Sequence, residues 1–273
     1  MSELNILERL TALGIPADFC VNFVPLSESD LSPFAAVTSK TEFFAAARAY
    51  NAQILETFME VGVLFTGTDG VILSPSAIIG AGTVIHPGTQ IRSGVTIGKN
   101  CVIGPNSIIE DSTIGDGCVV NATQIYSSVL EENVKIGPFS HVRPNSRLCK
   151  GVKVGDFVEI KNSTIGEDTH ASHLTYIGDS DVGARVNFGC GVATANYNGY
   201  AKARTTIGDD AFIGCNTNLV APVTIGAGGY TAAGSTIVEE VPADALGIAR
   251  ARQVVKLGWA ARLREKYKKF KKK

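Results

Sequence analysis

Large aliphatic residues recur every six positions from Leu73 onward, and this spacing predicts the fold. The first series runs through Leu73, Ile79, Ile85, Ile91, Ile97, Ile103 and Ile109. A six-residue period fits neither an amphipathic helix nor a strand with simple alternation. Hexapeptide repeats are typical of the parallel β-helix, in which no unit buries its own aliphatic side and stacked units share a continuous core. The pattern therefore predicts an all-β solenoid.

The six-residue register slips by one position in places and then recovers. The later members of the series are Ile114, Leu130, Ile136, Val142, Leu148, Val154, Ile160, Ile165, Ala171, Ile177, Ile207, Ile213, Leu219, Ile225 and Ile237. A slip would turn the side chains of a flat sheet to its other face, whereas a solenoid absorbs it at a corner by a shorter turn. The largest gap separates Phe188 from Ile207. There we expect a loop, residues 194–206, that leaves the coil between Asn196 and Lys202.

The first 70 residues lack this period and predict helices instead. Residues 4–13 form a short amphipathic pattern that ends at Gly14. A capping box, Ser39 with Glu42 three residues on, predicts the start of a second helix, and Gly62 predicts its end. Its apolar face consists of Phe43, Ala47, Tyr50, Ile54 and Phe58, which we interpret as packing residues. The chain is thus predicted to comprise a helical region (1–70), a solenoid (71–248) and a C-terminal segment with a basic tail (249–273).

The composition agrees with a chain of many tight corners. Glycine accounts for 29 of the 273 residues and charged residues for 19%, and corners with positive backbone angles favour glycine and asparagine. The six cysteines include no CxxC pair, so a metal or redox motif finds no support. No secretory leader or long apolar run occurs. We therefore expect a cytoplasmic protein without a membrane partner.

Charge is unevenly distributed, although the net charge is only −1. Residues 262–273 carry eight Lys or Arg and one acid, Glu265, whereas the rest of the chain carries 17 basic and 25 acidic residues. The simpler interpretation is a solvated, frayed tail. The alternative is a contribution to binding a polyanion such as a nucleotide cofactor. The basic run belongs to no recognisable nucleic-acid-binding module, so nucleic acid is not expected as a partner.

Candidate chemistry concentrates between Arg143 and Arg250. His173 lies in S-H-L-T-Y, just before Tyr176, and histidine is the side chain best suited to accept a proton near neutral pH. A histidine on a solenoid is, however, more often a plain corner or surface residue. His170 and His173 lie three positions apart without a clear third ligand, which argues against a metal site. The first 70 residues contain no GxGxxG or Walker A loop.

Several ordered motifs resemble one family closely. They are V-G-D-F-V-E-I-K-N-S-T-I-G (154–166), S-H-L-T-Y-I-G-D (172–179), N-Y-N-G-Y-A-K (196–202), I-G-D-D-A-F-I-G-C-N-T-N-L-V-A-P-V-T-I-G (207–226), and A-R-A-R-Q-V with G-W-A-A-R (249–262). Together they resemble the acetyltransferase half of the bacterial bifunctional enzyme that makes UDP-N-acetylglucosamine. That enzyme joins a glucosamine-1-phosphate N-acetyltransferase to an N-acetylglucosamine-1-phosphate uridylyltransferase. The similarity covers roughly residues 45–262.

The resemblance implies a left-handed parallel β-helix of hexapeptide repeats with a short helical N-terminal region, assembled as a homotrimer with active sites between subunits. It also implies that residues 40–65 are the helix that links the two halves in the family. The glycine-rich nucleotidyltransferase loop of the family is missing, so we expect no uridylyltransferase activity. A separately encoded nucleotidyltransferase is then a candidate partner, and residues 1–40 receive no role.

The resemblance also implies roles for individual residues. His173 would be the general base that takes a proton from the sugar amine. The sugar-phosphate ligands would be Arg143, Lys161, Tyr176, Asn187 and Lys202, a set that suits phosphate and sugar hydroxyls. The acetyl-CoA ligands would be Cys190, Asn196, Tyr197, Cys215, Ala233 and Arg250. Arg250 would meet a cofactor phosphate, while Cys190, Cys215 and Ala233 would contact through the backbone.

Three of these positions depart from the usual family pattern. Cys215 stands where the family usually has Ser, Cys190 where it often has Ala, and Asn198 where it usually has Asp. Contacts that Cys190 and Cys215 would make to acetyl-CoA through the backbone do not depend on these side-chain differences. Cys215 as a nucleophile is the alternative, but no activating base lies near it in sequence. Asn198 removes a charge from the loop, which would alter substrate preference.

The expected reaction is direct attack of the amine of glucosamine 1-phosphate on the acetyl-CoA thioester. His173 would remove the proton, a backbone N–H near Cys215 or Cys190 would stabilise the oxyanion, and no metal would be needed. Two alternatives stay open. One is a hexapeptide acyltransferase that acts on another amino sugar or nucleotide sugar. The other is a non-catalytic β-helix that scaffolds a partner, against which His173, Arg143 and Lys161 argue.

Overall fold

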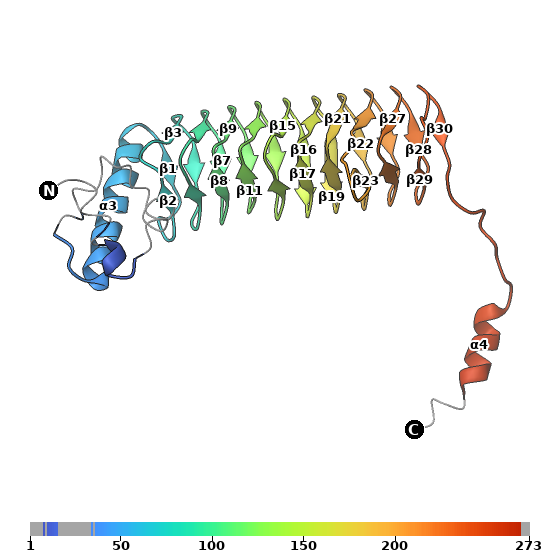
Figure 1. Cartoon of the computed structure of the whole chain (residues 1–273), viewed down its shortest axis with the longest axis horizontal. Helices are drawn as coiled ribbons and strands as arrows, with labels where there is room; N and C mark the ends of the chain where they lie inside the picture. The colour runs from blue at the N-terminus through green and yellow to red at the C-terminus, as the bar shows by residue number, and fades with distance from the viewer. Residues whose placement is uncertain (1–7, 9, 16–33, 35, 269–273) are drawn as a thin grey trace.

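The computed structural model describes residue 8, residues 10–15, residue 34 and residues 36–268. The first predicted helix (4–13) therefore lies only partly among the described residues, where 8 and 10–12 are helical. The basic residues beyond Lys268 lie outside them. From Leu64 to Gly247 the chain winds as a parallel β-solenoid with three sheets, one along each side (Figure 1). This confirms the all-β solenoid of hexapeptide repeats.

Each turn of the solenoid contributes one short strand to each sheet. Sheet A contains β1 (Leu64–Phe65), β4 (Val84–Ile85), β7 (Val102–Ile103), β10 (Val119–Val120), β13 (Lys135–Ile136), β16 (Lys153–Asp156), β19 (His170–His173), β22 (Asn187–Phe188), β25 (Phe212–Ile213), β28 (Tyr230–Thr231) and β30 (Leu246–Gly247). Sheet B contains β2 (Ile72–Leu73), β5 (Gln90–Ile91), β8 (Ile108–Glu110), β11 (Gln124–Tyr126), β14 (His141–Val142), β17 (Glu159–Lys161), β20 (Tyr176–Gly178), β23 (Ala193–Ala195), β26 (Asn218–Val220) and β29 (Thr236–Ile237). Sheet C contains β3 (Ile78–Ile79), β6 (Thr96–Ile97), β9 (Thr113–Ile114), β12 (Val129–Leu130), β15 (Arg147–Leu148), β18 (Thr164–Ile165), β21 (Ser180–Val182), β24 (Thr205–Ile207) and β27 (Val223–Ile225).

One residue of nearly every strand points into a continuous core, and the aliphatic series predicted from the sequence is buried throughout. The prediction missed Val120, Ile125 and Val182. Ile125 and Val182 each follow the preceding inward residue by five positions, and Val120 lies between two such slips. It also missed Thr194 and Thr231, which are 1% and 3% exposed at equivalent inward positions. Their hydroxyls accept hydrogen bonds from the backbone N–H groups of Gly178 (2.8 Å) and Gly214 (2.9 Å). The two inward threonines therefore use their hydroxyl groups as hydrogen-bond acceptors inside the core, so that these buried polar atoms have partners.

The register slips are absorbed at corners, as predicted. Ile114 follows Ile109 by five residues, yet it pairs in register with Ile97 on one side and Leu130 on the other. The shortened turn passes through Asp111, which has a φ of +46°. Because the turn takes up the missing residue, the strands on either side keep their inward faces.

The corners take positive φ angles, many of them at glycine and asparagine. The corner between sheets A and B is an exception in its middle turns. Phe139, Phe157 and Leu174 adopt φ values of 57°, 56° and 44° there, and their side chains are 61%, 59% and 58% exposed. The rings of Phe139 and Phe157 stack with centroids 5.5 Å apart. Bulky side chains are disfavoured in this backbone region, so the corner carries both strain and exposed apolar surface.

The loop that interrupts the coil is shorter than the predicted range 194–206. Strand β23 continues to Ala195 and β24 starts at Thr205, so only residues 196–204 leave the coil. The loop is itself partly ordered by an antiparallel bridge between Tyr197 and Lys202. The predicted range was too wide because the inward residue of β23 is Thr194, which the aliphatic pattern does not mark.

Helix α3 (Lys40–Glu60) covers the first turn of the solenoid (Figure 1). Ser39 caps it as predicted, since its hydroxyl accepts from the Glu42 N–H. The Glu42 carboxylate accepts from the N–H and the hydroxyl of Thr38, one residue earlier than an ordinary capping box. Gly62, at φ +89°, follows the C-cap. The helix side chains that join the solenoid core are Ile54, Leu55 and Phe58.

The solenoid starts before the predicted limit of 71, and its last strand, β30, ends at Gly247. Its first strand, β1, lies at Leu64–Phe65. The aliphatic pattern missed this strand because the turn from Leu64 to its partner Val84 spans 20 residues and so breaks the period. Beyond β30 the chain runs away from the solenoid to helix α4 (Trp259–Tyr267), which the sequence pattern did not predict (Figure 1). None of the α4 side chains is buried. No helix among the described residues is long and apolar enough to cross a membrane.

We expect Ile160→Ala to destabilise the solenoid by about 2–5 kcal/mol, because this side chain is fully buried and its loss leaves a cavity. Urea denaturation followed by circular dichroism measures the change. Thr164→Ala, on the exposed face of β18 in the same turn, is the matched control and should change stability little. Equal effects of the two substitutions would contradict the assigned core.

Candidate active site

Four predicted site residues form one column along the corner between sheets A and B, and Asp156 extends this column by one turn. Asp156 pairs with His173 across β16 and β19. The registers of the next strands place Cys190, Cys215 and Ala233 at the equivalent positions of the following turns. We call Asp156, His173, Cys190, Cys215 and Ala233 the corner column. Since neighbouring strands are ~4.8 Å apart, His173 and Ala233 are separated by about 14 Å along the axis.

The corner column presents unpaired hydrogen-bonding groups. Within the part of the chain that the structure describes, the backbone N–H groups of Cys190 and Cys215 donate to no other group. The His173 side chain is exposed and makes no hydrogen bond or ion pair there. Beyond Ala233, the Arg250 side chain passes next to Gly234, where an added Cβ would lie 3.8 Å from Arg250 Cδ. An exposed histidine, two unpaired backbone donors and an arginine side chain therefore follow one another along the corner.

A second group of predicted residues gathers on the outer face of sheet B. Lys161 ends β17 and Tyr176 begins the neighbouring β20. Lys202, from the loop, lies beside them, and contact with Lys161 and its charge lowers the pKa of Lys202, with Asp179 and Tyr176 opposing this shift. Two adjacent ammonium groups repel each other, so the pair is suited to a divalent anion such as a phosphate monoester.

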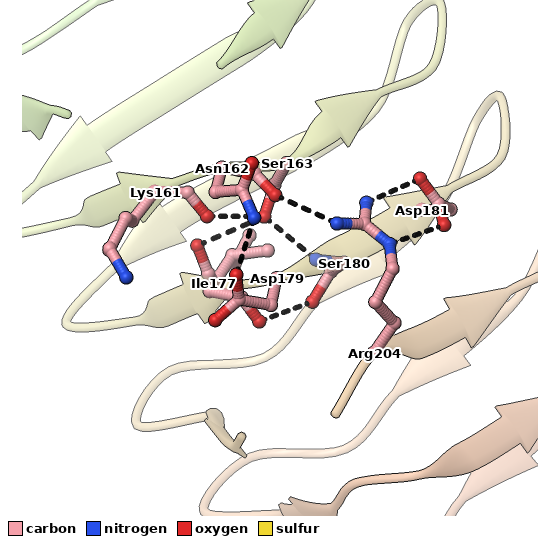
Figure 2. Close-up of polar contacts among 9 residues, drawn as sticks. Lys161, Asn162, Ser163, Ile177, Asp179, Ser180, Asp181 and Arg204 are labelled. Carbon is pink, nitrogen blue, oxygen red and sulfur yellow. Dashed lines mark hydrogen bonds and ion pairs between the residues drawn. The ribbon is translucent and has the colours of Figure 1, made fainter. Parts of the chain in front are cut away.

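Asp179 lies beneath this group and was not singled out from the sequence. Its side chain accepts from the Asn162 amide at 2.5 Å and from the Asn196 amide. Burial alone would raise the pKa of Asp179, but these two amides, with the charges of Lys161 and Lys202, outweigh it and lower the pKa. Figure 2 shows the Asn162 amide directed at the Asp179 carboxylate, with Lys161 on one side and Ser180 on the other. The carboxylate is therefore charged at neutral pH.

Tyr176 lies directly over Gly178. A Cβ at residue 178 would be 2.3 Å from Tyr176 Oη and 2.8 Å from Asn196 Nδ2. The Asn196 amide nitrogen also lies 3.3 Å from Tyr176 Oη. Only glycine leaves room for this arrangement, so Gly178 sets the positions of both side chains.

Not all predicted residues come together in a single chain. Arg143 lies at the end of β14 on the sheet B side, where Glu159 pairs with it at 2.8 Å. Asn187 lies on β22 of sheet A, around the corner from Lys161 and Tyr176. Tyr197 is an exposed loop residue that hydrogen bonds to the Gly199 carbonyl. The column residues and the sheet B group thus occupy neighbouring faces.

The predicted motifs contained some of the missed residues, but gave them no role. Asn162 lies within the motif of residues 154–166, and Gly178 and Asp179 are the last two residues of the motif of residues 172–179. Their importance depends on neighbours one turn away, which local sequence does not reveal. Among the described residues, no three His, Cys, Asp or Glu side chains are placed to hold a metal ion.

Comparison with known proteins agrees with these features. Residues 76–111 match the family described as bacterial transferase hexapeptide (six repeats), and residues 104–190 match the family described as GlmU-like, C-terminal hexapeptide. The bifunctional protein GlmU of Caldicellulosiruptor saccharolyticus is 48% identical over 244 residues, which is 89% of this chain and 53% of that protein. GlmU of Halalkalibacterium halodurans is 51% identical over 220 residues, 81% of this chain and 48% of that protein. The chain thus spans about half the length of the curated relatives it matches.

Among solved structures, the Arabidopsis UDP-N-acetylglucosamine acyltransferase covers 72% of this chain and 75% of its own, with 17% identity and a TM-score of 0.47. The solenoid fold and the matched repeats make the chain similar to bacterial transferases that carry hexapeptide repeats. More particularly, the chain is similar to the C-terminal hexapeptide part of the bifunctional protein GlmU.

We expect Gly178→Ala to lower the free energy of unfolding by about 1–3 kcal/mol, because the added methyl group collides with the Tyr176 ring. Urea denaturation measures it. In a Tyr176→Ala background the ring is gone, so the same substitution should cost much less. An equal cost in both backgrounds would show that Tyr176 does not lie over this glycine.

Proposed function

We propose that this chain catalyses acetyl-CoA-dependent N-acetylation of glucosamine 1-phosphate. The corner column is the observation that carries the proposal, because it lines up a free histidine, unpaired backbone donors and Arg250 along one edge. The relationship to the acetyltransferase part of GlmU supports the same reaction. The proposed product is N-acetylglucosamine 1-phosphate, a precursor of UDP-N-acetylglucosamine.

The cofactor is proposed to lie along the column, with its thioester near His173 and its phosphates toward Arg250. The corner suits this placement because its bulky apolar side chains end at Leu174, and the equivalent positions further on are Gly191, Asn216 and Gly234. Asn196 and Tyr197, at the base of the loop, would complete the cofactor site. Backbone contacts at Cys190, Cys215 and Ala233 do not depend on the side chain, so the two cysteines are compatible with this role.

The sugar phosphate is proposed to bind at Lys161 and Lys202, which place two ammonium groups side by side. A phosphate between them would relieve their repulsion. Tyr176 and Asn187 would meet sugar hydroxyls. Arg143 would join the phosphate site in competition with its ion pair to Glu159, which leaves both side chains about 40% exposed.

The chemistry would proceed by direct transfer. The amine nitrogen of the sugar attacks the thioester carbonyl, and His173 accepts the proton that the nitrogen loses. The free N–H of Cys190 or Cys215 stabilises the oxyanion, an effect commonly worth ~3 kcal/mol. The carbon–sulfur bond then breaks, and CoA leaves as a thiol after protonation.

A homotrimer is proposed because the required residues lie on different faces of a single chain. Asn187 lies on sheet A while Lys161 and Tyr176 lie on sheet B, so a neighbouring copy is needed to close the site. Phe139, Phe157 and Leu174 run directly beside the column, exposed and strained. We propose that they pack against the next copy, with three equivalent sites in cyclic symmetry.

We expect His173→Ala to cut turnover by ~10²–10⁴ while the protein stays folded, because the attacking amine loses its proton acceptor. Release of the CoA thiol with glucosamine 1-phosphate as acceptor measures it. His170→Ala, on the same strand, is the matched control and should retain near-normal turnover. Other amino sugars in the same assay test the acceptor, and wild-type protein inactive with all of them would reject the proposed function.

The trimer is tested by Phe157→Asn. Asparagine adopts a positive φ readily, so the chain should fold at least as well, yet the apolar contact to the next copy is lost. We expect light scattering to show a lower mass and thiol release to fall. Ser127→Asn, at another positive-φ corner, should leave both unchanged. An intact trimer in the Phe157 variant would place the interface elsewhere.

A further inference from the structure

Asp179 is a charged side chain in an unusual place. The residue is only 4% exposed, and its carboxylate accepts from two side-chain amides, those of Asn162 and Asn196. An ionised carboxylate accepts hydrogen bonds and cannot donate them. The nitrogen of each amide must therefore face Asp179, which removes the usual ambiguity between the two ends of an asparagine side chain.

The fixed amide determines what Asn196 offers to a ligand. With its nitrogen held by Asp179 and close to Tyr176 Oη, its oxygen Oδ1 points away from the carboxylate. No donor among the described residues bonds to this oxygen, and it is not an enclosed, unsatisfied atom. Asn196 Oδ1 is thus available to accept a hydrogen bond from a ligand that binds next to the loop.

The loop does not depend on Asp179 alone to keep its place. At its other end, the Arg204 guanidinium binds both Asp181 oxygens at 2.8 and 2.6 Å and donates to the Asn162 carbonyl at 3.2 Å (Figure 2). The Ala203 N–H donates to the Asn196 carbonyl at 2.9 Å. These contacts hold the loop ends through groups other than the Asp179 carboxylate.

We propose that Asp179 is a positioning residue that acts through Asn196, holding its amide so that Oδ1 accepts an N–H of the bound cofactor. The amide groups in the pantetheine arm of acetyl-CoA are donors of this kind. The inference rests on the proposed function, which gives Asn196 to the cofactor. Asp179 also faces Lys161 and Lys202, whose charges act on it. Its own charge therefore weakens the attraction of the lysine pair for a phosphate.

Asp179→Asn tests this with little change of shape, and asparagine tolerates the φ of +50° at this position. A neutral amide at 179 can donate to Asn196 Oδ1 and so turn that side chain over. We expect the Kd for CoA to rise roughly tenfold, while the Kd for glucosamine 1-phosphate stays unchanged or falls. Calorimetric titration of each ligand alone separates the two effects.

Two further variants sharpen the test. In an Asn196→Ala background, Asp179→Asn should not weaken CoA binding further, because the group it acts through is gone. Asp181→Asn removes the same charge from the other end of the loop and should change neither Kd appreciably. If Asp179→Asn raises the Kd of both ligands equally, Asp179 only holds the loop in place and the proposal is overturned. No change in either Kd would also overturn it.

The amide orientation can be measured without any ligand. In the wild-type protein the Asn196 side-chain NH₂ signal should exchange slowly with water in NMR, and in Asp179→Asn it should exchange faster. Rapid exchange in the wild-type protein would overturn the proposal directly. A protein that shows the protected amide but binds no CoA and transfers no acetyl group would reject the proposed function and leave the orientation of Asn196 established.

Discussion

The structure depends on keeping successive turns in parallel register around a shared core. Each inward aliphatic packs against its equivalent in the turns on either side, and burial of this stack is the main stabilising contribution that a solenoid has. The chain therefore tolerates changes of turn length only at corners, where Asp111 and similar residues take up a missing position. The one large departure, residues 196–204, leaves at a corner as well.

The same constraint builds the candidate site. Residues at one position of successive turns must lie in a line, so His173, Cys190, Cys215 and Ala233 become neighbours although they span 61 positions of the chain numbering. An extended ligand suits such a line better than a closed pocket. A compact charged ligand instead needs several side chains that meet at one point. The loop provides such a point by bringing Lys202 to Lys161 across the outer face of sheet B.

The sequence predicts the core well because large aliphatic residues mark the inward positions directly. The inward residues Thr194 and Thr231 do not show this signal, because they are not large aliphatics; their hydroxyl groups accept backbone hydrogen bonds inside the core. The site is predicted less completely. His173 and Lys161 stand out through their chemistry and motif. Asp179 does not, because its hydrogen-bond partners Asn162 and Asn196 are each 17 residues away and so one turn distant. Contacts of this kind appear only once the pitch of the coil is known.

Helix α3 has a further consequence for how the molecule behaves in concentrated solution. A solenoid end is a set of open strand edges, and open edges invite other chains to add on. Helix α3 occupies one of these ends, because its Ile54, Leu55 and Phe58 side chains belong to the solenoid core and its Asn51 amide donates to the Val71 carbonyl. The opposite end has no such cover among the described residues and terminates in the two-residue strands β29 and β30. Growth of a fibre by end-to-end stacking needs both ends free, so a helix at one of them is enough to stop it.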